Sequence, residues 1–212
     1  MRILPRLLTL MPTLLFTLRQ AEAAAPLAEC SEAALLERAD ELTAWSVSGV
    51  AKAHFASCPS AKCEQRPYVV QGDTLLTSPG PVGWACALFP SAKRAPTVGW
   101  LPAGNLVPAA GAPGWGGAWL KEGAGFYLHE SSGRVTGRGK TWVPNGLASE
   151  GGADNIVVTS MDIDEIPQGT RVEHRKDGCI LRLNRVGPYL VAATHGCGEE
   201  DLGGVFLYGY EL

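Results

Sequence analysis

The start of the sequence lacks an apolar run long enough to cross a membrane as a helix. Residues 7–18 form an apolar run of about a dozen residues that includes Pro12, whereas a spanning helix needs roughly 20. Two arginines precede this run, and small residues follow it up to Ala25. The pattern is typical of a secretory signal peptide, and the shortness of the run disfavours an uncleaved anchor. We therefore expect residues 1–25 to be cleaved, which leaves no stable membrane span.

The chain also has few charges, which make up 18% of its residues and form no basic patch. Its net charge of −3 becomes −5 once residues 1–25, with three arginines and one glutamate, are removed. Because binding to nucleic acid depends on cationic side chains, we expect no nucleic-acid partner. The sequence also has no glycine-rich phosphate-binding loop and no serine in a nucleophile-elbow motif.

Cysteine is present in an even number, six, and every cysteine follows residue 25. In an exported chain such a set indicates disulfides rather than metal ligands or nucleophiles. The two cysteines of the second half have no other partner nearby, and the four of the first half can pair in more than one way. The pairings that we prefer are Cys179 with Cys197, Cys58 with Cys63, and Cys30 with Cys86.

Helical periodicity is confined to one segment. Ser31 is a suitable N-cap for a helix from Glu32 to Leu42, in which apolar residues recur at three- and four-residue spacing. After Ala51 the sequence predicts short strands separated by turns rich in glycine and proline. Residues 109–115 have no periodicity and collect Pro, Gly and Ala, which predicts a linker. We therefore expect an all-β fold of two units, residues 28–108 with the short helix and residues 116–212.

Five strands are expected in the first unit, at the spacing of a small barrel. They are Ala51–Phe55, Tyr68–Val70, Thr74–Thr77, Trp84–Phe89 and Thr97–Leu101.

Several motifs of this unit resemble a bacterial SH3-like (SH3b) domain over roughly residues 50–108. They are, in order, Tyr68-Val69-Val70, Gly72-Asp73, Gly83-Trp84-Ala85-Cys86, Gly99-Trp100-Leu101 and Asn105-Leu106. The resemblance implies a small barrel in which a short helical turn precedes the last strand, with Trp84 and Trp100 in the core. One departure from the family pattern is the segment from Cys58 to Cys63, which we expect to form a disulfide-closed tip of the first loop, where a peptide-binding surface of this family places contacts.

The second unit has about eight alternating segments with no helix between them, which predicts an antiparallel up-and-down β-barrel or a curled sandwich. The expected strands are Ala118–Leu120, Gly125–His129, Arg134–Val143, Asn155–Asp162, Thr170–Arg175, Cys179–Val186, Tyr189–Ala193 and Val205–Tyr210. The first and last of these loosely resemble the end strands of avidin-like and lipocalin-like barrels, on Gly116-Gly117-Ala118-Trp119 and Phe206-Leu207-Tyr208-Gly209-Tyr210.

For the residues that could carry chemistry, we favour a structural role. His195 lies two residues from Cys197, yet a zinc site needs three or four ligands, and a disulfide-held loop explains both residues. Asp162, Asp164 and Glu165 lack the ligand run of a calcium loop, and we interpret them as a solvated turn. We expect no catalytic residue, no cofactor and no metal, and hence no enzyme.

The candidate binding surface consists of aromatic and acidic residues. Among the six tryptophans, which mostly suit core or interdomain packing, Trp115 beside the linker and Trp142 before a turn are the better candidates for exposed contacts. The acidic loop Glu199, Glu200 and Asp201 is a candidate docking patch for a cationic partner.

These features favour a periplasmic or secreted binding protein of the cell envelope that recognises a wall-associated peptide or protein. One alternative is a periplasmic inhibitor or immunity protein that caps a cationic wall-degrading hydrolase such as a lysozyme. A second alternative is an envelope enzyme of unknown type.

Overall fold

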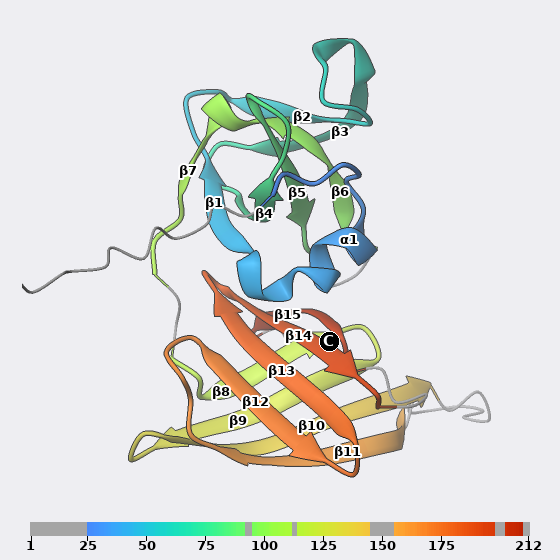
Figure 1. Cartoon of the computed structure of the whole chain (residues 1–212), viewed down its shortest axis with the longest axis vertical. Coiled ribbons are helices and arrows are strands. Elements are labelled where there is room, and N and C mark those ends of the chain that lie inside the picture. The colour runs from blue at the N-terminus through green and yellow to red at the C-terminus, as the bar shows by residue number, and fades with distance from the viewer. Residues whose placement is uncertain (1–24, 92–94, 112–113, 145–154, 198–201, 210–212) are drawn as a thin grey trace, which may run out of the picture.

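A computed structural model describes residues 25–91, 95–111, 114–144, 155–197 and 202–209. The chain forms two antiparallel β units, one on top of the other along the long axis of the molecule (Figure 1). The predicted all-β class is confirmed, as is the short helix that precedes the strands. The predicted signal peptide lies almost wholly outside the described residues.

The first unit contains one α-helix, three short 3₁₀ turns and seven strands. They are α1 (Glu32–Glu37), η1 (Ala39–Glu41), β1 (Thr43–Val47), β2 (Lys52–Ala56), η2 (Ala61–Cys63), β3 (Glu64–Val70), β4 (Thr74–Pro79), β5 (Trp84–Phe89), β6 (Thr97–Pro102), η3 (Ala103–Asn105) and β7 (Leu106–Pro108). No helix in the described part of the chain is long and apolar enough to span a membrane.

Helix α1 begins as predicted, because the Ala34 amide donates to Ser31 Oγ at 3.2 Å. It ends at Glu37, however, and the prediction of a helix to Leu42 is wrong. The chain turns into η1 instead, which directs Asp40 toward the second unit while Leu42 remains buried. Contacts across the chain therefore override the helical periodicity of this segment.

The seven strands of the first unit form one sheet in the order β3-β2-β6-β5-β4-β1-β7. Strands β4, β5 and β6 form a meander, β2 and β3 form a hairpin, and β7 returns to pair with β1. Gly99 lies where β2 crosses β6, and a Cβ there would be 3.0 Å from Ala56 O and 3.3 Å from Phe55 Cβ. The glycine of the Gly99-Trp100-Leu101 motif thus permits close approach of these two strands.

The second unit contains eight strands, each paired with its neighbour in the chain except β11 and β12. They are β8 (Gly117–Lys121), β9 (Ala124–Ser131), β10 (Arg134–Pro144), β11 (Asn155–Glu165), β12 (Arg171–Lys176), β13 (Cys179–Val186), β14 (Tyr189–His195) and β15 (Gly204–Tyr208). Pairing of β15 with β8 joins the two halves into a nearly closed barrel. At the seam, His174 of β12 lies 2.9 Å from Glu165 of β11, measured from Nδ1 to Oε1.

Aromatic side chains fill the centre of this barrel. Trp119, Phe126 and Phe206 are each 0% exposed, and the rings of Phe126 and Phe206 meet edge to face with centroids 4.8 Å apart. They belong to one cluster of buried residues that draws on every strand of the barrel. The barrel interior is therefore a packed core.

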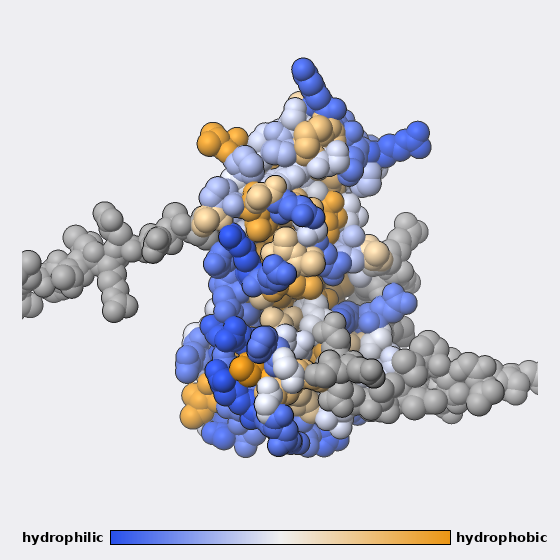
Figure 2. Space-filling view, turned by 45° about the vertical axis from the view of Figure 1, so that its right-hand side comes forward, coloured by the Kyte–Doolittle hydropathy of each residue, from blue (hydrophilic) through white to orange (hydrophobic). Residues whose placement is uncertain are grey.

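A second apolar cluster joins the two units. It combines Leu35 and Leu76 of the first unit with Val186, Tyr189 and Val191 of the second. On the face shown in Figure 2, hydrophobic residues gather over the middle of the molecule, while the barrel below is mostly hydrophilic. Burial of apolar surface between the units stabilises one fixed arrangement of the two.

Candidate functional site

Three disulfides are present, and they are the pairings preferred from the sequence: Cys30–Cys86, Cys58–Cys63 and Cys179–Cys197. None of the cysteines is free. The first disulfide ties the segment before α1 to β5, and Cys86 is 0% exposed. The third joins the start of β13 to the segment after β14, so that His195 lies beside a disulfide.

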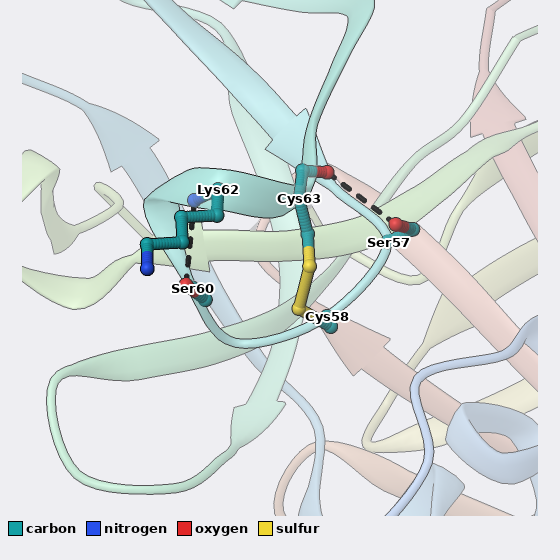
Figure 3. Close-up of a disulfide and its surroundings, with 5 residues drawn as sticks. All are labelled: Ser57, Cys58, Ser60, Lys62 and Cys63. Carbon is teal, nitrogen blue, oxygen red and sulfur yellow. Dashed lines mark hydrogen bonds between the residues drawn. A yellow bond between two sulfur atoms is a disulfide. The ribbon is translucent and has the colours of Figure 1, made fainter.

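The Cys58–Cys63 disulfide closes the tip of the β2–β3 hairpin, which projects from the first unit on the side away from the barrel (Figure 1). In Figure 3, Ser57 Oγ donates to Cys63 O at 3.4 Å and the Lys62 amide donates to Ser60 Oγ at 3.3 Å. The Lys62 side chain points away from the disulfide. Ser57, Pro59, Ala61 and Lys62 are exposed, so the tip is accessible to solvent.

A groove on the first unit, which we call the Trp groove, is lined mainly by apolar and aromatic residues. Its volume is about 260 Å³, and the turn between β4 and β5 forms one of its walls. Its lining residues are Thr43, Trp45, Thr77, Ser78, Pro79, Gly80, Pro81, Val82, Gly83, Trp84, Ala85, Ala103 and Leu106. Strands β1, β4, β5 and β7 and turn η3 thus all contribute.

Hydrogen bonds hold one indole of the Trp groove in place. Trp45 Nε1 donates to Thr43 Oγ1 at 2.8 Å, and that hydroxyl lies within hydrogen-bond distance, 3.2 Å, of Thr77 Oγ1. Both Trp45 and Trp84 are half-buried, so that part of each side chain faces solvent. Two partly exposed indoles, one of them held by a hydrogen bond, offer apolar contact area to a ligand.

The turn that carries Trp84 is closed by backbone hydrogen bonds. The Trp84 amide donates to Pro81 O at 2.9 Å, and the Gly80 amide donates to Trp84 O at 3.2 Å. At the edge of the groove, the side chain of Val82 is fully exposed. Aromatic and proline walls of this kind suit an extended peptide segment.

Sequence reasoning assigned Trp84 to the core and did not single out Trp45. The signal for a site was the segment Pro79-Gly80-Pro81, which ends three positions before Trp84, because a turn at a strand start leaves the next aromatic near the surface. Trp100, also assigned to the core, is indeed buried.

The prediction that Trp115 is an exposed contact is wrong. Trp115 is 1% exposed and belongs to the barrel core. Its amide donates to Glu130 Oε2 at 2.9 Å, its carbonyl accepts a hydrogen bond from Trp119 Nε1 at 3.0 Å, and Arg185 lies 4.9 Å from its ring centroid. The residue closes one part of the barrel rather than belonging to the linker.

Trp142 is half-buried on β10, and its ring lies close to Gly125 of β9. Part of this side chain is accessible, so its role as a contact stays a prediction. The acidic loop Glu199, Glu200 and Asp201 lies outside the described residues.

The interpretation of Asp162, Asp164 and Glu165 as a solvated turn is wrong, because all three lie on β11. Cross-strand bonds from Arg138 to Asp162 and from Arg134 to Asp164 neutralise two of them. The Arg138 guanidinium also holds the pKa of Asp162 below its usual value. These carboxylates therefore support the β10–β11 pairing.

Among the described residues, Glu173 on β12 has the most ionic contacts. Three guanidinium groups donate to its carboxylate, those of Arg171 at 2.8 Å, Arg175 at 2.8 Å and Arg182 at 2.9 Å. Hydrogen bonds from Arg182, Arg175 and Arg171 lower the pKa of Glu173 to about 2. Within the ranges that the structure describes, no group of three or more His, Cys, Asp or Glu side chains is placed to hold a metal ion.

Comparisons of the chain with known protein families, curated proteins and solved structures found no match.

Proposed function

We propose that this chain is an exported binding protein of the cell envelope, periplasmic or secreted, whose first unit is an SH3-like module that holds a wall-associated peptide in the Trp groove. The observation that carries the proposal is the pair of half-buried indoles, Trp45 and Trp84, in one groove with two prolines. Export is supported by the three disulfides, which persist in oxidising compartments.

The SH3-like assignment is supported by the order of elements in the first unit. A hairpin follows the first strand, a three-strand meander comes next, and η3 then leads into β7, which pairs with β1. This order agrees with the helical turn and last strand that the sequence motifs imply. A scaffold alone says little about function, so the proposal rests on the groove.

A peptide is the ligand class that suits this groove best. Its walls are apolar, while hydroxyl groups of Thr43, Thr77 and Ser78 lie among the lining residues. Indole faces and prolines pack against extended chains, and hydroxyls supply hydrogen bonds to their backbone. The disulfide-closed hairpin tip lies in the same unit but does not line the groove.

A pull-down on purified peptidoglycan sacculi tests this proposal. The mature protein should be retained, and Trp84→Ala should weaken retention by about tenfold, as expected when one aromatic contact is lost. Val82→Glu should weaken it as well, because it places a charge at the edge of the apolar groove without altering the core.

The matched control is Tyr127→Ala, which removes an aromatic side chain that is 47% exposed on the second unit. Retention should not change in this variant. Equal retention of wild type, Trp84→Ala and Val82→Glu, all folded by circular dichroism, would contradict the proposal. Loss of retention in Trp142→Ala alone would place the contact on the barrel instead.

A further inference from the structure

A second, larger groove lies at the junction of the two units, and we call it the junction groove. Its volume of about 560 Å³ falls within the usual range for ligand sites, roughly 300–1,000 Å³. Helix α1 and residues Pro90, Ser91, Ala95 and Pro96 form one side, while the β8–β9 turn, β14 and the start of β15 form the other. Because both units contribute, the groove exists only where they are packed together.

The floor of the junction groove is apolar. Leu36 of α1, Ala193 of β14 and Val205 of β15 are half-buried there and pack against the apolar cluster that joins the units. Ala192 beside them is fully buried. The floor is therefore part of the interface between the units.

Carboxylates dominate the charge of the described groove walls. Glu32 and Glu37 of α1 and Glu122 of the β8–β9 turn are all exposed. None of the ion pairs found in the described ranges involves these three residues. The ammonium group of Lys121 donates to Gly203 O and lies 5.3 Å from the centroid of the Phe206 ring, so it is engaged within the wall.

We propose that the junction groove receives a lysine or arginine side chain on an extended segment of a cationic partner protein. Such a side chain has a long aliphatic stem that suits the floor formed by Leu36 and Ala193, and a charged end that suits the three carboxylates. The net charge of −5 on residues 26–212 attracts a cationic partner to this surface. This binding site is separate from the Trp groove and goes beyond the function proposed for it.

The test titrates the mature protein with a synthetic peptide of alternating lysine and alanine with blocked ends. Binding is monitored by NMR of the protein. Titration should shift the methyl signals of Ala33 and Ala193, which line the groove. The double variant Glu37→Gln with Glu122→Gln should weaken binding of the peptide roughly fivefold, which is the affinity that two exposed ion pairs contribute. Added salt should weaken binding too, because it screens these charges.

A matched pair, Glu41→Gln with Glu64→Gln, removes the same charge from exposed carboxylates outside the groove and should leave affinity unchanged. Ala33→Leu narrows the mouth of the groove without altering charge, on an exposed helical position that tolerates leucine. This variant should abolish the methyl shift of Ala193.

The proposal would be overturned if a glutamate-and-alanine peptide of equal length bound with the same affinity. It would also be overturned if the lysine peptide shifted only signals of residues outside the junction groove. It would also be overturned if Lys93→Ser with Arg94→Ser, between groove residues Ser91 and Ala95 in the sequence, weakened binding more than the glutamate pair did. Retention on sacculi should be the same for wild type and the glutamate pair. The NMR titration therefore tests the junction groove, and retention on sacculi tests the Trp groove, so either proposal can fail without the other.

Discussion

Tyr189, the first residue of β14, donates a hydrogen bond from its hydroxyl to Thr74 O on β4, with 2.6 Å between the two oxygens. The bond crosses the junction of the units, and Tyr189 is 6% exposed. Nearby, Asp40 of η1 accepts a hydrogen bond from Asn184 at 3.1 Å and lies 3.2 Å from Arg171. Polar contacts therefore determine the orientation of the units across an interface that is otherwise apolar.

Replacing Tyr189 by phenylalanine should lower the free energy of unfolding by about 1 kcal/mol at neutral pH, because Thr74 O loses its partner. Urea unfolding followed by circular dichroism measures this change. Tyr68→Phe, at a position that is 47% exposed, is the control and should have no effect.

The same tyrosine should make stability depend on alkaline pH. Burial, with a smaller contribution from Asp73, raises the pKa of Tyr189 from 10.0 to about 12. The unfolded chain therefore loses this proton first, so stability is complete below pH 10 and is lost as the pH rises toward 12. The loss should reach roughly 2–3 kcal/mol. Tyr189→Phe should not show this part of the pH dependence, and an unchanged pH profile in this variant would contradict the assignment.

Glu173 should make stability depend on acidic pH, and its contribution should be lost as the pH falls. Its pKa is lowered from 4.5 to about 2, so the stabilising contribution is present above pH 4.5 and is lost as the pH falls through 2. NMR titration of the Glu173 carboxyl should give a midpoint near 2, and Arg182→Gln should move that midpoint upward. A midpoint near the ordinary glutamate value in the wild type would show that the arginine contacts do not form.

Removing the disulfides one at a time should destabilise the protein in the order of the loop lengths. The sequence separations are 56 for Cys30–Cys86, 18 for Cys179–Cys197 and 5 for Cys58–Cys63. The entropy of loop closure predicts losses of about 4, 3 and 2 kcal/mol for the paired Cys→Ser variants. Thermal and urea unfolding provide the measurement, and a Cys179→Ser variant as stable as wild type would exclude a stabilising role for that bond.

Trp115 and Trp142, which were equal candidates for exposed contacts in the sequence analysis, should differ sharply in how much each stabilises the fold. Trp115→Ala should cost roughly 3–5 kcal/mol, because it removes a fully buried side chain from the barrel core. Trp142→Ala should cost much less, because this residue is half-buried at the surface. Equal melting temperatures for the two variants would contradict the assignment of Trp115 to the core.

Local patterns predicted most strands well. The bounds Trp84–Phe89 and Cys179–Val186 were predicted to the residue, since turn residues on both sides mark where these strands begin and end. β1 and β7 were not predicted from the sequence. Their strand conformation depends on pairing with each other and, for β1, with β4.

The two grooves could not be predicted from local sequence patterns. Trp45 and Trp84 are 39 positions apart in the sequence, and they line one groove because β1, β4 and β5 are neighbours in the sheet. The junction groove depends even more on tertiary structure, since α1 and β14 come from different units. Trp115 was misplaced for the same reason, because its burial depends on contacts that close the barrel.

The sequence by itself determined the strand-and-turn pattern, the all-β class, the helix cap at Ser31 and the pairing of Cys179 with Cys197. These properties follow from short-range backbone preferences and from which cysteines lie in the same part of the chain. Tertiary structure alone decided which tryptophans are buried, where α1 ends, and that two grooves form. Burial and surface shape depend on residues that meet only after the sheets close and the units pack, and no local pattern contains that information.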